Sequence, residues 1–194
     1  MKSSRFLLSL VLLSLSTLTL AQSDMPKPDA QKSDPQKSDA QQSFDKIKTL
    51  AGSWEGHVTT VPAQSDMGDG SNLQISMRVT SRGNALVHEM MPAGTTDDPT
   101  KNDHPVTMFY LDSDRLLLTH YCDAGNRPRM VARTSPDGKT LEFDFLDVAG
   151  STQYGHMQHA AFTVIDANHH TEDWTYLMPG DKPMHAHMDL QRTR

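Results

Sequence analysis

The sequence predicts an all-β fold: an antiparallel up-and-down barrel of about ten strands, preceded by a short N-terminal helix. Three observations lead to this prediction. Apolar and polar residues alternate along several runs, as they do in residues 72–80, which is typical of half-buried strands. Turn-forming residues separate these runs at short intervals. No long helical period interrupts them, which argues against a parallel sheet.

The first 21 residues predict a secretory signal peptide. Lys2 and Arg5 give a positive start, an apolar run follows, and Thr19 and Ala21 are small residues at the expected cleavage positions. The run is short and rich in serine for a spanning helix, although an uncleaved membrane anchor is the alternative. Cys122 is the only cysteine, so none is available for a lipid anchor. We therefore expect an exported protein, periplasmic or secreted, with no stable membrane anchor.

Residues 22–42 predict a disordered polar linker. Residues 31–35 and 36–40 nearly repeat each other, lysines alternate with aspartates, and Met25 is the one large apolar side chain. Such a segment buries too little surface to offset its chain entropy. Residues 43–194 then form the folded domain, which has enough chain for an apolar core.

The charge balance bears on the partners. The chain carries a formal charge of −6, and removal of the signal peptide would make this about −8. Binding to a phosphate backbone needs a positive surface, so we expect no nucleic acid partner. One cysteine cannot form an internal disulfide.

A short helix opens the folded domain. Ser43 is a suitable N-cap, and Phe44, Ile47 and Leu50 fall on one side of a helix. Gly52 then ends it. From this point on the period of the pattern changes to two.

Ten strands follow, each with boundaries uncertain by about 2–4 residues. They are expected at residues 53–61, 72–80, 85–91, 105–111, 115–122, 128–134, 140–147, 155–165, 170–177 and 184–192. Ten antiparallel strands leave two exposed edges unless the sheet closes. A barrel is the simplest closure, and a two-sheet sandwich is the alternative.

The start of the first strand carries a family resemblance. The segment Leu50-Ala51-Gly52-Ser53-Trp54-Glu55-Gly56 resembles the opening of lipocalin-like (calycin) barrels, where a Gly-x-Trp segment follows a short helix. The resemblance implies a barrel with an internal cavity for an apolar or amphipathic ligand. Among ten-stranded relatives it extends to nitrobindin-like haem barrels, although no segment here matches their iron ligand.

The domain also resembles a set of uncharacterised exported bacterial proteins. The similarity lies in the run from Thr119 to Met130, in Gly155-His156-Met157 and in Glu172-Asp173-Trp174-Thr175. It covers most of residues 43–194 and implies no particular activity.

His120 and Cys122 are the first candidate site residues. They share a strand face with Leu116 and Leu118, because alternate residues point the same way. If that face points inward, both lie in the cavity as a ligand anchor or a soft metal site. The alternative is a hydrogen-bonded core histidine beside a buried thiol.

An arginine cluster is the second candidate. Arg129 and Arg133 share a face just after a turn that contains Asn126. At a barrel mouth, such guanidinium groups would bind an anionic head group. The alternative is that they pair with surface carboxylates.

The remaining histidines favour no metal site. His185 and His187 share a strand face opposite an apolar set, so we expect them in solvent. His156 and His159 are three apart and face opposite ways on a strand. We predict no metal site and identify no cofactor.

We therefore expect a barrel that binds a small amphipathic or anionic molecule. The candidate ligand-binding residues are His120, Cys122, Asn126, Arg129, His156 and Trp174. Two alternatives are an enzyme that uses the region of His120 and Trp174, and a haem or metal binder. No catalytic motif is present to name a reaction.

Overall fold

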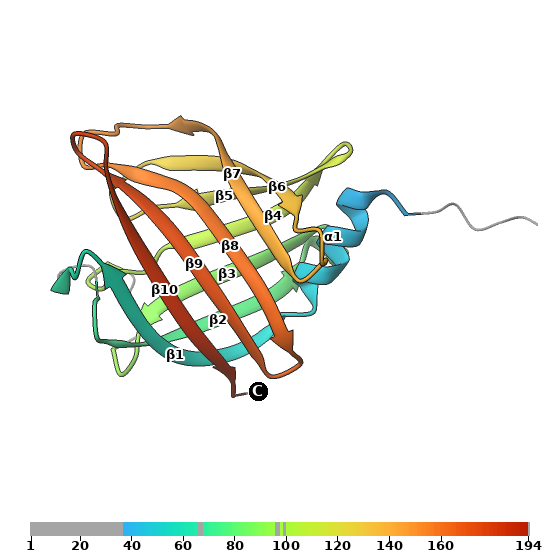
Figure 1. Ribbon diagram of the computed structural model, residues 1–194, viewed down its shortest axis with the longest axis horizontal. Helices are drawn as coiled ribbons and strands as arrows, with labels where there is room; N and C mark the ends of the chain where they lie inside the picture. Colours follow the sequence, from blue (N-terminus) through green and yellow to red (C-terminus); the bar gives the residue numbers. More distant parts are fainter. Residues whose placement is uncertain (1–36, 66–67, 96–97, 99, 194) are drawn as a thin grey trace, which may run out of the picture. The chain divides into compact units, whose positions relative to one another are not determined.

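The fold is a closed barrel of ten antiparallel strands (Figure 1). The computed structural model describes residues 37–65, 68–95, 98 and 100–193, so the predicted signal peptide and residues 22–36 of the predicted linker lie outside the described residues. Each strand pairs with its neighbours in sequence, and β1 also pairs with β10, which closes the sheet. This confirms the predicted up-and-down barrel and excludes the two-sheet sandwich.

The ten strands lie within about two residues of their predicted positions. They are β1 (Gly52–Val61), β2 (Asn72–Thr80), β3 (Ala85–Pro92), β4 (Val106–Asp112), β5 (Arg115–Tyr121), β6 (Arg127–Thr134), β7 (Thr140–Ala149), β8 (His156–Asp166), β9 (His169–Met178) and β10 (Lys182–Arg192). A short 3-10 helix, η2 (Ser81–Gly83), connects β2 and β3.

The N-terminal helix α1 (Asp39–Lys48) begins earlier than the sequence indicated. Ser38, not Ser43, is the N-cap, and its Oγ accepts a hydrogen bond from the backbone N–H of Gln41 at 3.2 Å. The predicted cap at Ser43 is therefore wrong, and residues 39–42, which we expected in the linker, form the first turn of the helix. Among the described residues, no helix is long and apolar enough to cross a membrane.

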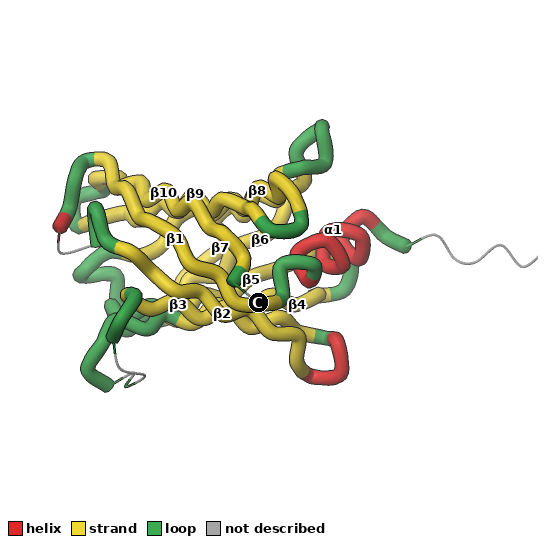
Figure 2. Tube along the Cα trace, turned by 90° about the horizontal axis from the view of Figure 1, so that it is seen from below, coloured by secondary structure: helices red, strands yellow, loops and turns green. Residues whose placement is uncertain are grey.

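Helix α1 covers one end of the barrel, and both Figure 1 and Figure 2 show it there. Phe44 and Ile47 are buried on its inner side, as their spacing predicted. The hairpins β2–β3, β4–β5, β6–β7 and β8–β9 turn at this end, which we call the closed end. The connections β1–β2, β3–β4, β5–β6, β7–β8 and β9–β10 meet at the opposite end, which we call the mouth.

The Gly-x-Trp segment secures the closed end. The Trp54 indole N–H donates to the Leu50 carbonyl at 2.8 Å, and the Arg192 guanidinium lies 4.1 Å from the Trp54 ring centre. Arg192 also donates to the Ala51 carbonyl at 2.7 Å. The first strand, the helix and the last strand are therefore joined through one tryptophan and one arginine.

Aromatic side chains fill the barrel next to this end. The rings of Phe109, Phe143 and Phe162 pack edge to face, with centroids 5.3–5.8 Å apart. Trp174 packs on Phe162 at 5.6 Å. Such pairs are favourable beyond the apolar area that they bury, so this part of the interior is core.

Candidate functional site

A row of polar side chains runs along the inner face of β9. His170, Glu172, Trp174 and Tyr176 alternate along the strand, and all four are buried. Because residues two apart share a strand face, the row leads from the closed end toward the mouth. It places an ionisable carboxyl group in the middle of the barrel.

Glu172 is fully buried, and three donors surround it. Its carboxylate accepts from His88 Nε2 at 3.1 Å, from His170 Nε2 at 3.1 Å and from the Trp174 indole N–H at 3.0 Å. Burial alone would raise the pKa of Glu172, but attraction to His88 and hydrogen bonds from both histidines outweigh it and hold the pKa below its usual range. The carboxyl group is therefore ionised at neutral pH.

This arrangement shows which nitrogen of each ring donates to the carboxylate. An ionised carboxylate only accepts hydrogen bonds, so His88 and His170 each carry a proton on Nε2. Their Nδ1 atoms are buried and have no hydrogen-bond partner among the described residues. Within that part of the chain, no three His, Cys, Asp or Glu side chains are arranged to hold a metal ion.

His120 lies on the mouth side of this network. It sits across the sheet from Thr107 on β4, and Thr107 in turn sits across from His88 on β3. The Thr107 hydroxyl and His120 Nδ1 are 2.8 Å apart, and the Trp174 ring centre is 5.3 Å from that of His120. The structure thus brings His120 and Trp174 together, as the sequence predicted.

The His120 ring is neutral, and only one of its two nitrogens is hydrogen-bonded. Burial, with a smaller contribution from His88, lowers the pKa of His120 to about 3. Nδ1 is bonded to Thr107, whereas Nε2 has no hydrogen-bond partner in the described part of the chain. Nε2 is not among the fully buried unpartnered atoms of the described residues, so it keeps access to solvent at the mouth side of the barrel.

A hollow of about 680 Å³ opens above His120 at the mouth. His120, Cys122, Met157 and Tyr176, from the inner faces of β5, β8 and β9, contribute to its lining. The remaining lining comes from the β3–β4 and β5–β6 connections: Thr100, Lys101, Asn102, Asp103, Pro105, Asp123 and Ala124. We call this hollow the mouth pocket.

Cys122 shares the mouth pocket with His120, in line with the expectation that both face the cavity. Burial raises the pKa of the Cys122 thiol, so the group is a thiol at neutral pH. Tyr176 is fixed by its hydroxyl, which donates to the Tyr154 carbonyl at 2.6 Å. These side chains give the pocket a partly apolar floor.

Two carboxyl groups stand at one wall of the mouth pocket. Asp103 and Asp123 lie within hydrogen-bonding reach, and burial, that hydrogen bond and the charge of Asp123 together raise the pKa of Asp103 to about 7. Both side chains keep contact with water. Asp103 is therefore partly protonated near neutral pH.

Asn126 is near the mouth but has a structural role. Its buried side chain donates to the carbonyls of Ser151 at 2.9 Å and Gly155 at 2.7 Å. These bonds hold the β7–β8 connection, where a Cβ on Gly155 would lie 2.3 Å from the Leu177 carbonyl oxygen. Asn126 Oδ1 is buried without a partner in the described residues, but Asn126 does not line the mouth pocket.

Arg129 is not in the mouth pocket. It lies on the outer face of β6, and its Nε donates to Asp147 at 2.8 Å. Arg133 is bonded in the same way to Asp144 at 2.7 Å. Pro128 and Met130 occupy the inner face instead. The prediction that Arg129 forms a ligand-binding mouth is thus corrected, and the alternative, pairing with surface carboxylates, holds.

The other predicted histidines also lie away from the pocket. His156 is half-buried, its Nε2 is 3.0 Å from Gln158, and its ring packs on Phe145. His185 and His187 are exposed on the outer face, as expected.

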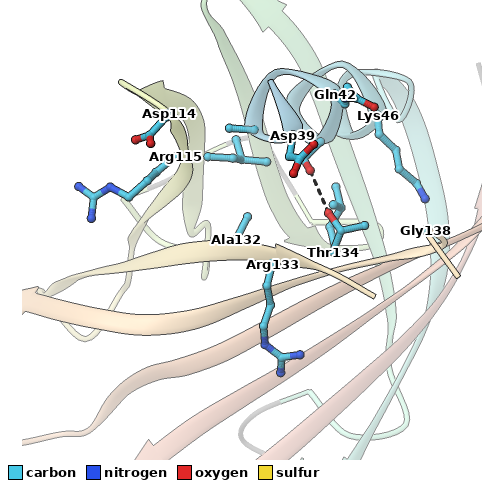
Figure 3. Close-up of a pocket in the computed structure, with 13 residues that line it drawn as sticks. Asp39, Gln42, Lys46, Asp114, Arg115, Ala132, Arg133, Thr134 and Gly138 are labelled. Atoms are coloured by element: carbon cyan, nitrogen blue, oxygen red, sulfur yellow. Dashed lines mark hydrogen bonds between the residues drawn. The ribbon is translucent and has the colours of Figure 1, made fainter. Parts of the chain in front are cut away.

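A second hollow, of about 600 Å³, lies under α1 at the closed end. Figure 3 shows Asp39, Gln42 and Lys46 from the helix above Thr134, with Arg115 and Arg133 extending away from the helix. A hydrogen bond of 2.9 Å between Ser43 and Thr134 spans it, drawn as the dashed line. Its arginines are paired with surface carboxylates, so we interpret it as the seam between helix and barrel.

Sequence reasoning missed three members of the buried network: His88, His170 and Glu172. A signal for two of them was present, because His170 and Glu172 precede Trp174 at two-residue spacing and therefore share its strand face. His88 had no such signal, since it is 84 residues from Glu172 in the chain.

Comparisons with known proteins show a similarity of fold alone. No protein-family model matches the chain, and no curated protein matches its sequence. A solved structure of a protein of unknown function from the DUF3598 family of Nostoc punctiforme PCC 73102 is similar, with a TM-score of 0.50 and 10% sequence identity. The match covers 76% of this chain and 49% of that one, so this chain spans about half the length of that protein.

Proposed function

We propose that this protein binds a small molecule in the mouth pocket. The observation that carries the proposal is His120, which is only 2% exposed, forms part of the pocket lining and uses one ring nitrogen while the other is unpartnered. A few polar groups that converge on a pocket fix the orientation of its ligand. A ligand with a complementary polar group would satisfy Nε2.

The size and lining of the pocket suit such a ligand. Small-molecule sites typically measure about 300–1,000 Å³ and combine apolar walls with a few convergent polar groups; the mouth pocket, at about 680 Å³, falls in this range. Met157, Tyr176 and Pro105 supply apolar surface, and His120 supplies the polar anchor. Phe109, Phe143 and Phe162 occupy the interior toward the closed end, so the ligand stays close to the mouth.

An amphipathic ligand fits this lining, whereas an anionic ligand does not. The predicted anion-binding residue, Arg129, pairs with Asp147 on the outer face. Nothing among the described residues favours the enzyme or the haem and metal alternatives over binding.

The calycin relationship and the export of the protein are part of the same proposal. A barrel that closes on a short helix and carries Trp54 at the start of β1 is consistent with a lipocalin-like binding protein. The proposed periplasmic or extracellular location rests on the N-terminal sequence pattern.

Methyl NMR tests the binding site. We would label the methionine methyl groups, screen a library of small aromatic and aliphatic fragments, and compare Met157 in the pocket with Met130 in the core. Binders should shift the Met157 methyl signal and leave that of Met130 in place. The variant His120→Phe, which keeps an aromatic ring, should fold and lose most of the affinity.

Two results would reject the proposal. Fragments that bind but never shift the Met157 signal would place the site elsewhere. Equal affinity for wild type and a folded His120→Phe variant would show that the unpartnered nitrogen has no part in binding.

A further inference from the structure

The mouth pocket has a strongly acidic wall. Asp103 comes from the β3–β4 connection and Asp123 from the β5–β6 connection, so two separate loops bring their carboxyl groups together. The backbone N–H of His104 also donates to Asp123 Oδ2 at 3.1 Å, which holds the two loops in register. Two carboxyl groups this close repel each other when both are ionised.

The basic residue beside this pair has another partner. Lys101 also lines the pocket, but its ammonium group pairs with Asp98 at 2.9 Å. The other titratable groups that line the pocket are His120, Cys122 and Tyr176. Low pKa for the imidazole and raised pKa values for the thiol and the phenol leave all three uncharged near pH 7.

The surrounding mouth has the same sign of charge. Its described connections carry five aspartates, whereas three basic residues lie in these connections or at the adjacent strand ends. The aspartates are Asp69, Asp98, Asp103, Asp123 and Asp181, and the basic residues are Lys101, Arg127 and Lys182. A concave site lined by one sign of charge concentrates ligands of the opposite sign.

We propose that the ligand of the mouth pocket carries a protonated amine or guanidinium group, held between Asp103 and Asp123, with its apolar part over Met157 and Tyr176. This inference rests on the proposed function and names the class of its ligand. His120, nine-tenths buried and with an unpartnered Nε2 facing the same hollow, supplies a further hydrogen bond. A cationic group can donate to both carboxylates at once, and such charge-assisted bonds are the stronger kind.

Binding then exchanges one cation for another. In the free protein the carboxyl group of Asp103 is partly protonated near pH 7. When the ammonium or guanidinium group enters, Asp103 becomes ionised and its proton passes to the buffer. The ligand itself arrives and remains protonated.

Three probes of similar size separate charge from shape. Phenethylamine is cationic, 2-phenylethanol is neutral and 3-phenylpropanoate is anionic, and each titration would follow the Met157 methyl signal and the heat of binding. We expect the amine to bind about 10- to 100-fold more tightly than the alcohol, which is the usual contribution of a charge-assisted hydrogen bond. Repeating the calorimetry near pH 7 in buffers of different ionisation enthalpy should show proton release for the amine only.

Matched variants assign the effect to the pair. Asp103→Asn with Asp123→Asn should remove the preference for the amine and the proton release. Asp181→Asn, a carboxylate at the same end that does not line the pocket, should change neither.

The outcomes keep the two proposals apart. If the alcohol binds at Met157 as tightly as the amine, or the anion binds most tightly, the cationic class is wrong and the binding pocket stands. If the double variant keeps the full preference, the acidic pair is not its source and the inference fails. If none of the three probes shifts the Met157 signal at millimolar concentration, both proposals fail.

Discussion

Removing the charge of Glu172 is the sharpest perturbation of the buried network. The variant Glu172→Gln keeps the size of the side chain and one acceptor oxygen, but it replaces the other oxygen with an NH₂ group. That group would face N–H donors from His88, His170 or Trp174, which lie 3.0–3.1 Å from the carboxylate in the wild type. At least one buried donor would then lose its partner.

The expected cost follows from these contacts. A hydrogen bond to a charged group contributes about 1.5–3 kcal/mol, and breaking a buried charge pair by changing one partner costs about 3–5 kcal/mol in total. The first figure is the better guide, because the variant also avoids the desolvation of a carboxylate, which offsets part of the loss. For a domain of this size we expect the Tm to fall by about 3–12 °C.

The neighbouring residue provides the control. Asp173 is on the outer face of the same strand, where it accepts from His187 at 2.6 Å with about half of its side chain exposed. Asp173→Asn should cost about 1 kcal/mol or less, since exposed pairs contribute little. Urea denaturation followed by circular dichroism measures both variants. A loss for Glu172→Gln no larger than for Asp173→Asn would refute the account of the buried network.

The pH dependence of stability tests the direction of the Glu172 pKa shift. The pKa of Glu172 is lower in the folded protein than in the unfolded chain, so ionised Glu172 contributes stability above about pH 4, its unfolded pKa, and this contribution is lost as the pH falls toward the folded pKa. The difference in unfolding free energy between wild type and Glu172→Gln should therefore be constant at neutral pH and shrink in acid. A difference that grows on acidification contradicts the assignment.

Three further predictions concern the mouth and the outer face. Arg129→Ala should leave ligand affinity and thermal stability indistinguishable from wild type, because the ion pair of Arg129 with Asp147 is exposed. Weakened binding of phenethylamine by this variant would contradict the prediction. Asn126→Ala should cost about 1–3 kcal/mol, because the carbonyls of Ser151 and Gly155 lose their donor and that of Gly155 is buried. Asn126→Asp, which replaces the donor with a charge, should cost more. Equal stability of all three proteins in urea would exclude a structural role for the Asn126 hydrogen bonds. The folded pKa of Asp103, about 7, is above its unfolded value, so the contribution of protonated Asp103 to stability is present below about pH 4 and is lost as the pH rises through 7. Wild type should therefore lose stability relative to Asp103→Asn over that range. A carboxyl carbon NMR titration of Asp103 with a midpoint near 4 would contradict the prediction.

The alternating pattern predicted the strands because it reports directly on burial. Along β10, for example, Met184, Ala186, Met188 and Leu190 are buried and the residues between them are exposed. The helix start was less determined, since Ser38 and Ser43 are both good caps. Ser38 is the one that precedes Asp39, whose carboxylate lies in the favourable first turn.

The site was predictable only in part. Period two placed His120 with Cys122 correctly, but at β6 it failed to choose a face, because Val131 between two arginines resembles core as much as Met130 does. The register shift between Arg129 and Met130 adds to this ambiguity. The buried network joins residues from β3 and β9, and Asp103 meets Asp123 through two loops. Such long-range pairs leave no local trace in one sequence.

The reactivity of Cys122 tests most directly whether the mouth pocket binds a ligand. Cys122 is the only cysteine, and it lines the pocket beside His120. Its alkylation by iodoacetamide at pH 7.5, followed by intact mass, should be slow, because burial raises the pKa of the thiol. Phenethylamine or 2-phenylethanol, whichever binds by calorimetry, should slow it further in proportion to occupancy, and His120→Phe should reduce that protection. An unchanged alkylation rate at saturating ligand would show that the ligand lies elsewhere and would contradict the account.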